Sequence, residues 1–401
     1  GGELLNAVGR SWRGAQLPIA GLRRHCAYRF CLSVQGMGDH SAVDVAQHVH
    51  ESVLRKYGCL APHHHLHYDE TVPASNTWEA LYIDDRVVTQ VLPLRHVSDI
   101  SEQYEDVRIV KKGERAYRET PGLDQAPEKS IRHAERFTAW GTTVDGRRGT
   151  AGAPSERRAL VCSCLAAAVN KGRLDKKSLE RLVGSLVHPL QHRRQLMCVL
   201  SECYQFLNQI DYGRYYNIPG NVSSELIAAA LLLPIASTNI RWPISDIVSA
   251  SDATPSAFGI CRAKMPSNIS RGLFRISEHR GEHARMDWSE MQSQLNPSRM
   301  PQPSAYVNHL GDTAPWRVTR SSRFNQIHHV NVQELEAMLV ELRERAIESR
   351  GSGLRFNILV DSRVALGCWA KGRSSSRKLN QCLRRALGYS VLGQTSMHAT
   401  W

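Results

Sequence analysis

The spacing of apolar residues predicts a chain that begins with mixed strands and helices. Residues 25–38 predict a strand that enters a glycine turn. The helix expected next begins after Asp39, ends near Gly58, and has one apolar face formed by Val43, Ala46, Val49 (or His50) and Val53. Further on, residues 78–88 predict a hairpin, and the period of apolar residues in 97–118 predicts a second helix.

The middle of the chain has the apolar period of helices. Residues 149–155 are rich in Gly, Ala and Pro and predict a boundary ahead of it. Residues 156–212 then carry three amphipathic stripes, and a short helix from Ser223 or Ser224 to Pro234 follows. The residues of the three stripes are Leu160, Cys164, Ala167 and Ala168, then Leu179, Leu182, Val183, Leu186 and Val187, then Leu196, Leu200, Cys203 and Leu207.

From residue 247 onward the pattern is that of an α/β domain. Strands are predicted at 247–252, 258–263, 316–319 and 356–362, and a helix is predicted around Leu335, Met338 and Leu342. A basic helix is expected at 376–387, and the polar stretch 277–313 predicts a surface insertion. The fold class expected for the whole chain is therefore α/β and α+β, in several domains.

The net charge of the chain indicates what kind of partner it binds. The formal net charge is +13 and the pI is near 9.4, which favours an anionic partner such as nucleic acid. Residues 1–38 contain one acid, Glu3, and no acid follows Asp361. A solvated basic face is the alternative, but two acid-poor ends favour a surface that contacts phosphates.

The cysteines and the apolar runs indicate where in the cell the protein is located. The ten cysteines show no paired C-x-x-C spacing, which favours reduced thiols inside a cell, in cytoplasm or nucleus. No signal peptide is visible, and the longest apolar run, 226–236, is too short to span a membrane. Since the chain starts at Gly1, we expect a fragment of a longer protein.

Two sets of acids carry the candidate chemistry. Asp84 and Asp85 sit between apolar, strand-forming residues, where a divalent cation such as Mg²⁺ would relieve their repulsion; a simple turn is the alternative. Asp252 and Asp361 end strands and Glu334 begins a helix, so they could meet at one sheet edge as a two-metal site. Taken singly, each would be an ordinary cap, loop or surface acid. The tract His63–His67 was weighed as a metal site, but its neighbours favour an exposed loop.

Several motifs together resemble a known family. Residues 251–259, 331–337 and 360–366 resemble the ribonuclease H domain of retroelement polyproteins. Residues 33–38, 82–85, 127–130 and 137–141 resemble, in order, the template-grip, catalytic-hairpin, lysine and primer-grip motifs of a reverse transcriptase palm. The nearest likeness is to DIRS-like or LTR-like elements. The resemblance implies a partial palm at 1–150, a helical thumb or connection segment at 151–240, and a ribonuclease H-like mixed sheet with helices at 241–401.

The resemblance also implies roles for single residues. Asp84 and Asp85 would hold Mg²⁺, or Mn²⁺, for RNA-directed DNA synthesis, and Asp252, Glu334 and Asp361 would hold the ions of the ribonuclease. The partners implied are an RNA template, a DNA primer, an RNA–DNA hybrid and deoxynucleoside triphosphates, with no membrane. Substrate contacts would come from Gln35, Gly36, Tyr82, Lys129, Arg363, Lys371 and Arg373. For Lys129, a solvated surface lysine is an equal alternative.

The departures from the family pattern favour a fragment. No Asp precedes Asp39, where the family has a further palm ligand, and no acid follows Asp361, where the ribonuclease domain has its closing Asp. We therefore expect little activity from these 401 residues alone. A non-catalytic nucleic-acid-binding remnant is the alternative of another class. A standalone nuclease is a third, which the missing closing acid disfavours.

Overall fold

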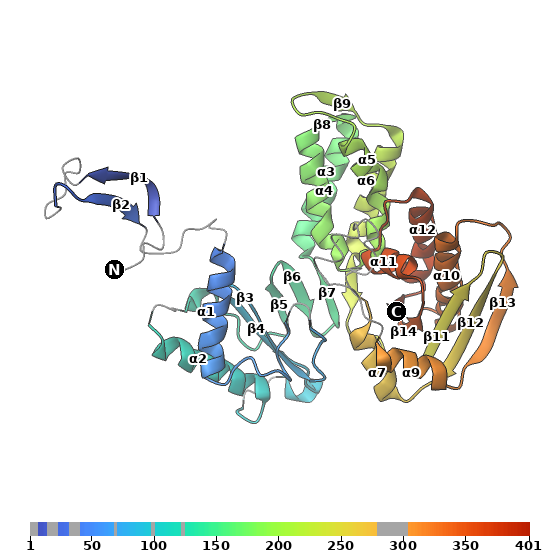
Figure 1. Cartoon of the computed structure of the whole chain (residues 1–401), viewed down its shortest axis with the longest axis horizontal. Coiled ribbons are helices and arrows are strands. Elements are labelled where there is room, and N and C mark those ends of the chain that lie inside the picture. Colours follow the sequence, from blue (N-terminus) through green and yellow to red (C-terminus); the bar gives the residue numbers. More distant parts are fainter. Residues whose placement is uncertain are drawn as a thin grey trace. The chain divides into compact units, whose positions relative to one another are not determined.

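A computed structural model describes residues 7–13, 23–31, 41–67, 70–97, 101–121, 125–278 and 304–401. The chain divides into two compact units, Gly1–His133 and Ala134–Trp401. Both mix helices with strands, as the fold class predicted (Figure 1). Within the described ranges, no helix is both long and apolar enough to cross a membrane.

The first unit is built on two antiparallel strand pairs and two long helices. Strand β1 pairs with β2, and β3 pairs with β4. Helix α1 and helix α2 both pack against β3. A small core forms around Leu54, Leu81 and Ala116. The elements are β1 (Ala7–Arg13), β2 (Ala27–Cys31), α1 (Ala42–Lys56), β3 (Thr77–Tyr82), β4 (Asp85–Gln90), η2 (Leu94–His96), α2 (Glu105–Glu119) and η3 (Pro127–Lys129).

Helix α1 forms where predicted, and most of its predicted face is confirmed. His50, the stated alternative to Val49, is buried, and Val53 packs against the core beside the buried Leu54. Val43 and Val49 are 51% and 49% exposed, so the prediction is wrong for Val43. Residues 33–38, predicted as a glycine turn, and Asp39 lie outside the described residues.

The prediction of an exposed histidine loop is wrong for two of its residues. His65 is 6% exposed and forms a bridge to Glu79 on β3. The Nδ1 atom of His64 lies 3.0 Å from Ser75 Oγ and 3.1 Å from the Thr77 carbonyl oxygen. The imidazole of His64 thus has polar partners in the following segment, and the backbone of His65 is held by its β-bridge to Glu79.

The second unit begins with a small sheet and a helical bundle. The sheet has the order β10-β7-β6-β5, and the predicted boundary 149–155 contains its strand β7. The bundle confirms the helical middle of the chain. The elements are β5 (Arg136–Ala139), β6 (Thr142–Asp145), β7 (Thr150–Gly152), α3 (Ser155–Lys171), β8 (Arg173–Asp175), α4 (Lys176–Gln191), η4 (Arg194–Leu200), α5 (Ser201–Leu207), β9 (Tyr215–Asn217), α6 (Gly220–Leu232), η5 (Leu233–Ile235) and β10 (Ser237–Asn239).

Two details of the bundle differ from expectation. In α3 the buried side chains are Val161, Leu165 and Ala168, so the predicted stripe is displaced by one residue, and Leu160 is 65% exposed. The helix has apolar residues on almost every side, and only the packing of α6 decides which of them are buried. Helix α6 begins at Gly220 after Pro219, ahead of the serines predicted as its cap.

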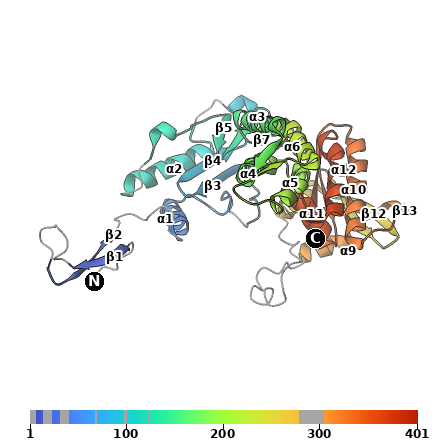
Figure 2. The ribbon, with the colours of Figure 1, turned by 90° about the horizontal axis from the view of Figure 1, so that it is seen from above.

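A five-stranded sheet follows, in the order β13-β12-β11-β14-β15. Strands β13, β12 and β11 are antiparallel neighbours, and β11, β14 and β15 run parallel. Helices α10 and α12 lie side by side against the sheet, and α7 packs on β14 and β15 (Figures 1 and 2). The bounds are β11 (Ile247–Ala253), β12 (Ala257–Lys264), α7 (Ser267–Ile276), α9 (Ala305–Thr313), β13 (Arg317–Arg323), α10 (Val330–Ser349), β14 (Leu354–Leu359), α11 (Arg363–Lys371), α12 (Arg377–Val391) and β15 (Thr395–Thr400).

The four predicted strands and two predicted helices of this region are confirmed, but the predicted insertion is not wholly on the surface. Its last residues form α9, and Val307 of that helix is buried beside Val248 and Leu273. One continuous core also joins the bundle to the sheet. It contains Leu165, Leu186 and Leu226 from the bundle together with Leu335, Phe356 and Leu383.

Candidate functional site

Three acidic residues from three elements meet at one edge of the five-stranded sheet. Asp252 lies at the end of β11, Asp361 follows β14, and Glu334 is near the start of α10. Because β11 and β14 are parallel neighbours, their carboxyl ends share an edge. One carboxylate oxygen from each of the three acids lies within 4.8 Å of the others. We call Asp252, Glu334 and Asp361 the acidic triad.

Two hydrogen bonds hold the elements that carry the triad. Gln333 is fully buried, and its Nε2 donates to the Pro255 carbonyl oxygen at 2.8 Å, which ties the start of α10 to the turn after Asp252. Trp401 Nε1 donates to the Asp361 carbonyl oxygen at 3.1 Å. Both hydrogen bonds go to backbone carbonyl oxygens. They therefore hold the elements that carry the acids in place and do not neutralise the carboxylate charges.

The electrostatics of the triad are unfavourable without a cation. Burial, followed by the charges of Asp361 and Asp252, raises the pKa of Glu334 to about 7. Burial and the charge of Asp252 also raise the pKa of Asp361. Three carboxylates at this spacing form a donor set that suits a hard divalent ion such as Mg²⁺ or Mn²⁺, which takes oxygen ligands. In the described part of the chain, this is the one group of three or more such side chains close enough to share an ion.

The predicted substrate residues of this half are spread over α11. Arg363 lies near the triad, with its guanidinium 3.7 Å from the centre of the Trp401 ring. Lys371 is the last residue of this helix, about 12 Å from Arg363 at 1.5 Å per residue, and Arg373 lies just beyond its end. Arg373 packs over the ring of Tyr204 in α5. The structure therefore brings Arg363 to the triad and leaves the other two apart from it.

The predicted hairpin of the first unit is confirmed, and it has a two-residue turn with Tyr82 opposite Asp85. Asp84 and Asp85 are exposed, and Tyr82 is 60% exposed. The pair therefore lies at the surface, at the tip of the hairpin. The buried acid of this hairpin is Glu79, whose Oε1 accepts hydrogen bonds from Arg86 Nε at 2.8 Å and Nη2 at 2.5 Å. Among the described residues, no third metal-binding side chain joins Asp84 and Asp85.

The turn of this hairpin is held by helix α1. Ile83 has a φ of 56°, a backbone conformation that a β-branched residue rarely adopts. Its N–H donates to Gln47 Oε1 at 2.6 Å, and its carbonyl oxygen lies 2.8 Å from His50 Nδ1. The other nitrogen of His50 lies 2.9 Å from the Tyr117 hydroxyl. Both backbone groups of the strained residue therefore have partners on α1.

No contact among the described residues brings the other predicted substrate residues of the first unit to the Asp84–Asp85 hairpin. Lys129 is exposed in the short helix η3. Gln35 and Gly36 lie outside the described residues. Sequence reasoning, in turn, did not identify Gln47, His50, Gln333 or Trp401 as residues that hold the acids. Their partners are distant in the sequence, so no local spacing pointed to them.

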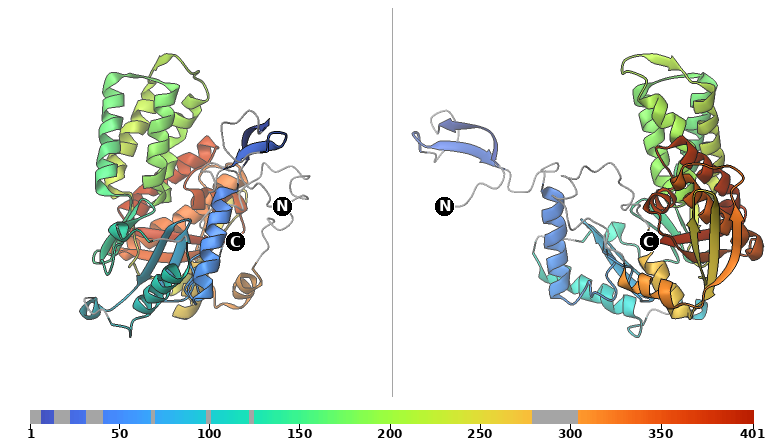
Figure 3. Two further views of the ribbon diagram at one scale, coloured as in Figure 1. Left: turned by 90° about the vertical axis from the view of Figure 1, so that its left-hand side faces the viewer. Right: turned by 45° about the vertical axis from the view of Figure 1, so that its right-hand side comes forward.

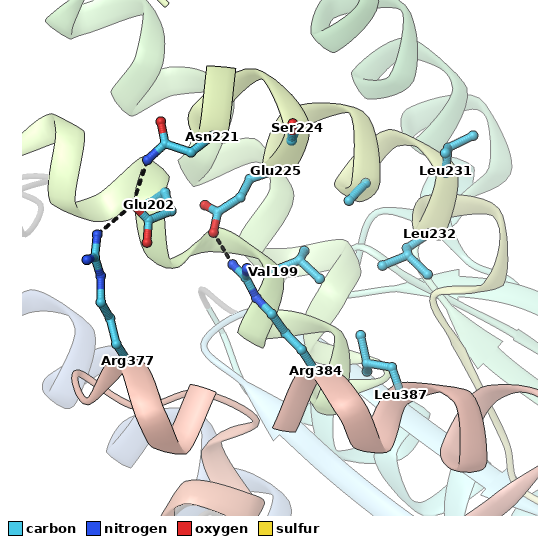
Figure 4. A pocket seen from close by; sticks show the side chains of 11 residues that line it. Val199, Glu202, Asn221, Ser224, Glu225, Leu231, Leu232, Arg377, Arg384 and Leu387 are labelled. Carbon is cyan, nitrogen blue, oxygen red and sulfur yellow. Dashed lines mark hydrogen bonds and ion pairs between the residues drawn. The ribbon is translucent and has the colours of Figure 1, made fainter. Parts of the chain in front are cut away.

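A separate cavity of about 760 Å³ lies between the bundle and α12 (Figure 4). Its charged residues pair with one another: Arg384 with Glu225, and Arg377 with Glu202. Leu231 and Leu387 form part of the apolar lining. The paired charges give this cavity a structural role in joining α12 to the bundle.

No protein-family model matches the chain, and no curated protein is significantly similar to it. Solved structures of the foamy viral protease–reverse transcriptase are similar to it at low scores. The complex with double-stranded DNA has 12% identity and a TM-score of 0.38, over 94% of this chain and 60% of that chain. The complex with RNA/DNA hybrid has 11% identity and a TM-score of 0.34, over 93% and 60%. A third, the dRH form with double-stranded DNA, has 11% identity and a TM-score of 0.37, over 90% and 49%. The chain thus spans about half to three fifths of these proteins, and TM-scores this low carry no argument about fold or activity.

Proposed function

We propose that the second unit is a metal-dependent ribonuclease acting on the RNA strand of RNA–DNA hybrids. The observation that carries this proposal is the acidic triad, whose oxygens lie within 4.8 Å of one another at one sheet edge. A mixed sheet flanked by helices is also what the resemblance to ribonuclease H implies. The net charge of +13 favours the polyanionic substrate.

The residues at and around the triad would have different roles in this reaction. Asp252, Glu334 and Asp361 would hold two Mg²⁺ or Mn²⁺ ions, which supply activation of water and stabilisation of charge on the phosphodiester when bound. Gln333 and Trp401 keep the elements that carry these carboxylates in place. Arg363, stacked on Trp401 near Asp361, would contact a phosphate of the hybrid.

We also propose that this unit belongs to a retroelement reverse transcriptase, with a partial palm near 1–150, a thumb or connection segment near 151–240 and the ribonuclease near 241–401. The support is the order of the sequence motifs and the exposed Asp84–Asp85 hairpin. In that role Asp84 and Asp85 would hold Mg²⁺, and Tyr82, Gln35, Gly36 and Lys129 would contact the template, primer or nucleotide. A non-catalytic nucleic-acid-binding remnant is the competing proposal.

The test compares Asp361→Asn with the unchanged chain in two measurements. Mn²⁺ binding followed by electron paramagnetic resonance reports on the triad even if turnover is slow. We expect Asp361→Asn to weaken it by at least about tenfold, since groups at a metal site each contribute about 10–100-fold. Any hydrolysis of a 20-base-pair RNA–DNA hybrid that the unchanged chain shows with Mg²⁺ should be abolished by the same change.

Asp312→Asn is the matched control, because Asp312 is an exposed acid of the same unit on α9. It should leave both measurements unchanged. Retention of Mn²⁺ binding by Asp361→Asn would show that the triad is not the metal site. Hybrid binding with neither Mn²⁺ uptake nor hydrolysis would favour the non-catalytic remnant.

A further inference from the structure

The β8–β9 end of the helical bundle carries a group of aromatic and basic side chains remote from the acidic triad. Strands β8 and β9 form a two-stranded antiparallel sheet where α3 ends and α4 begins, and this small sheet lies at the end of the bundle away from the five-stranded sheet (Figures 1 and 3). We call the group the tyrosine–cation patch. It consists of Lys171, Arg173, Lys176, Lys177, Tyr212, Arg214 and Tyr215.

The two tyrosines of the patch expose most of their surface. Tyr212 is 64% exposed and Tyr215 is 62% exposed. Tyr212 is oriented by its hydroxyl, which donates to Glu180 Oε1 at 2.7 Å. Large aromatic side chains are normally buried for most of their area. Two of them exposed at and just before β9 indicate a surface that contacts something else.

Cations surround both rings. Lys171 Nζ lies 5.4 Å and the Arg173 guanidinium 5.7 Å from the centre of the Tyr215 ring. Lys176 Nζ lies 5.0 Å from the centre of the Tyr212 ring. Attraction to the ring face restrains these otherwise flexible side chains. The result is an array in which positive charge and aromatic surface alternate.

The positive charge of the patch is largely uncompensated. Within the described part of the chain, Lys171, Arg173, Lys177 and Arg214 make no ion pair with a carboxylate. Of the acids nearby, Asp175 accepts a hydrogen bond from the Ser178 N–H as the cap of α4. The five basic residues of the patch outnumber the neighbouring acids, which are Asp175, Glu180 and Asp211.

From this arrangement we infer that the tyrosine–cation patch binds single-stranded nucleic acid. Lys171, Arg173, Lys177 and Arg214 contact successive phosphates, and an unpaired base stacks on Tyr215. Exposed aromatic rings inside a basic surface are the general means of binding single strands, because every base has a face that can stack. The inference is independent of metal binding at the triad and extends the proposed function to a second contact site.

The test measures the affinity of the full chain for fluorescein-labelled (dT)20 by anisotropy, in EDTA so that the triad takes no part. Tyr215→Ala should weaken binding by about tenfold, the loss expected for one stacked base. Tyr215→Phe retains the ring and should bind within about twofold of the unchanged chain. Equal losses in Tyr215→Ala and Tyr215→Phe would overturn the stacking.

The charge contribution is tested with a pair of matched double variants. Lys171→Ala with Arg173→Ala should reduce the slope of log affinity against log salt by about 1.4, since each phosphate contact on a single strand contributes about 0.7. Lys264→Ala with Arg343→Ala also removes two exposed cations, from β12 and α10, and should leave the slope unchanged. The same slope in both double variants would overturn the assignment of phosphates to the patch.

A blunt 20-base-pair DNA duplex distinguishes paired from unpaired strands. The effect of Tyr215→Ala should be confined to (dT)20, because the bases of a duplex are not free to stack on the ring. An equal loss on the duplex would overturn binding of a single strand. Since none of these measurements needs hydrolysis, loss of the proposed ribonuclease activity would leave their outcome unchanged.

Discussion

At the scale of the residue, the charge of Glu334 in the acidic triad lowers the stability of the folded chain when no metal is bound. Its carboxyl group is partly buried beside two other carboxylates, and together these raise its pKa to about 7. At pH 8, above this pKa, Glu334 without metal is mostly charged, and its repulsion from the neighbouring carboxylates opposes folding. Sites that bind cations commonly carry such a cost, which disappears when the ion is bound.

The pH dependence of stability follows from the direction of this pKa change. Between about pH 4.5 and pH 7 the folded chain binds more protons at Glu334 than the unfolded chain does, so the free energy of unfolding falls as the pH rises. In EDTA, Glu334→Gln should therefore be more stable than the unchanged chain at pH 8, and the difference should shrink toward pH 5. Chemical unfolding across this pH range measures the difference in the free energy of unfolding between the two proteins. As a control, saturating Mg²⁺ should reduce this difference at pH 8. Parallel stability profiles for the two proteins in EDTA would contradict the prediction.

At the scale of the element, one arginine of the β3–β4 hairpin packs so closely against helix α2 that the helix needs a glycine there. Arg86 reaches across from β4 to pair with Glu79, and its Nη2 also donates to the Ile109 carbonyl oxygen at 3.0 Å. The side chains of Arg86 and Glu79 are 10% and 1% exposed. The guanidinium lies over Gly113 of α2, where a Cβ atom would fall 1.8 Å from Nη1. The glycine is needed there for space.

Gly113→Ala should therefore destabilise the first unit by about 1–3 kcal/mol, the usual cost of overpacking. The arginine cannot move aside cheaply, because it is held by a buried carboxylate and a backbone carbonyl. Gly184→Ala in α4 is the matched control: its Cβ would meet nothing within 4 Å, so the change should stabilise the second unit by about 0.5–1 kcal/mol. Chemical unfolding of both variants checks this. A neutral Gly113→Ala would show that Arg86 is free to move.

At the scale of the whole molecule, the bundle and the five-stranded sheet of the second unit share one core. An ion pair joins them beside the cavity of Figure 4, where Arg384 of α12 meets Glu225 of α6. Glu225 is 4% exposed and also accepts a hydrogen bond from the Cys203 N–H at 2.8 Å. A continuous core, with an ion pair between Arg384 and the buried Glu225 across it, favours unfolding of residues 134–401 in one step.

Arg384→Met should lower the free energy of unfolding of this unit by about 2 kcal/mol, because it leaves the buried Glu225 carboxylate without its charged partner. Arg377→Met is the control on the same helix. Arg377 is 66% exposed, so loss of its pair with Glu202 should cost less than about 1 kcal/mol. Urea unfolding followed by circular dichroism measures both. Separate transitions for bundle and sheet would contradict the shared core.

The sequence alone determined the helical middle of the chain, the four strands and two helices predicted after residue 247, and the three acids of the triad. Those acids could be recognised because each lies at the end of a strand or the start of a helix, where local pattern and motif coincide. It also determined the hairpin at Asp84 and Asp85. These features depend on residues that are close together in the chain.

Only the tertiary structure decided which surfaces are buried and which side chains are partners. The buried acid of the hairpin is Glu79 because Arg86 and the Leu60 N–H reach it. The buried face of α3 is set by α6, and the histidine tract is partly buried because β3 supplies its partners. The tyrosine–cation patch joins residues 171–177 with residues 212–215, which α4, η4 and α5 separate in the chain. Burial depends on neighbours that are distant in the chain, and a period of apolar residues does not specify those neighbours.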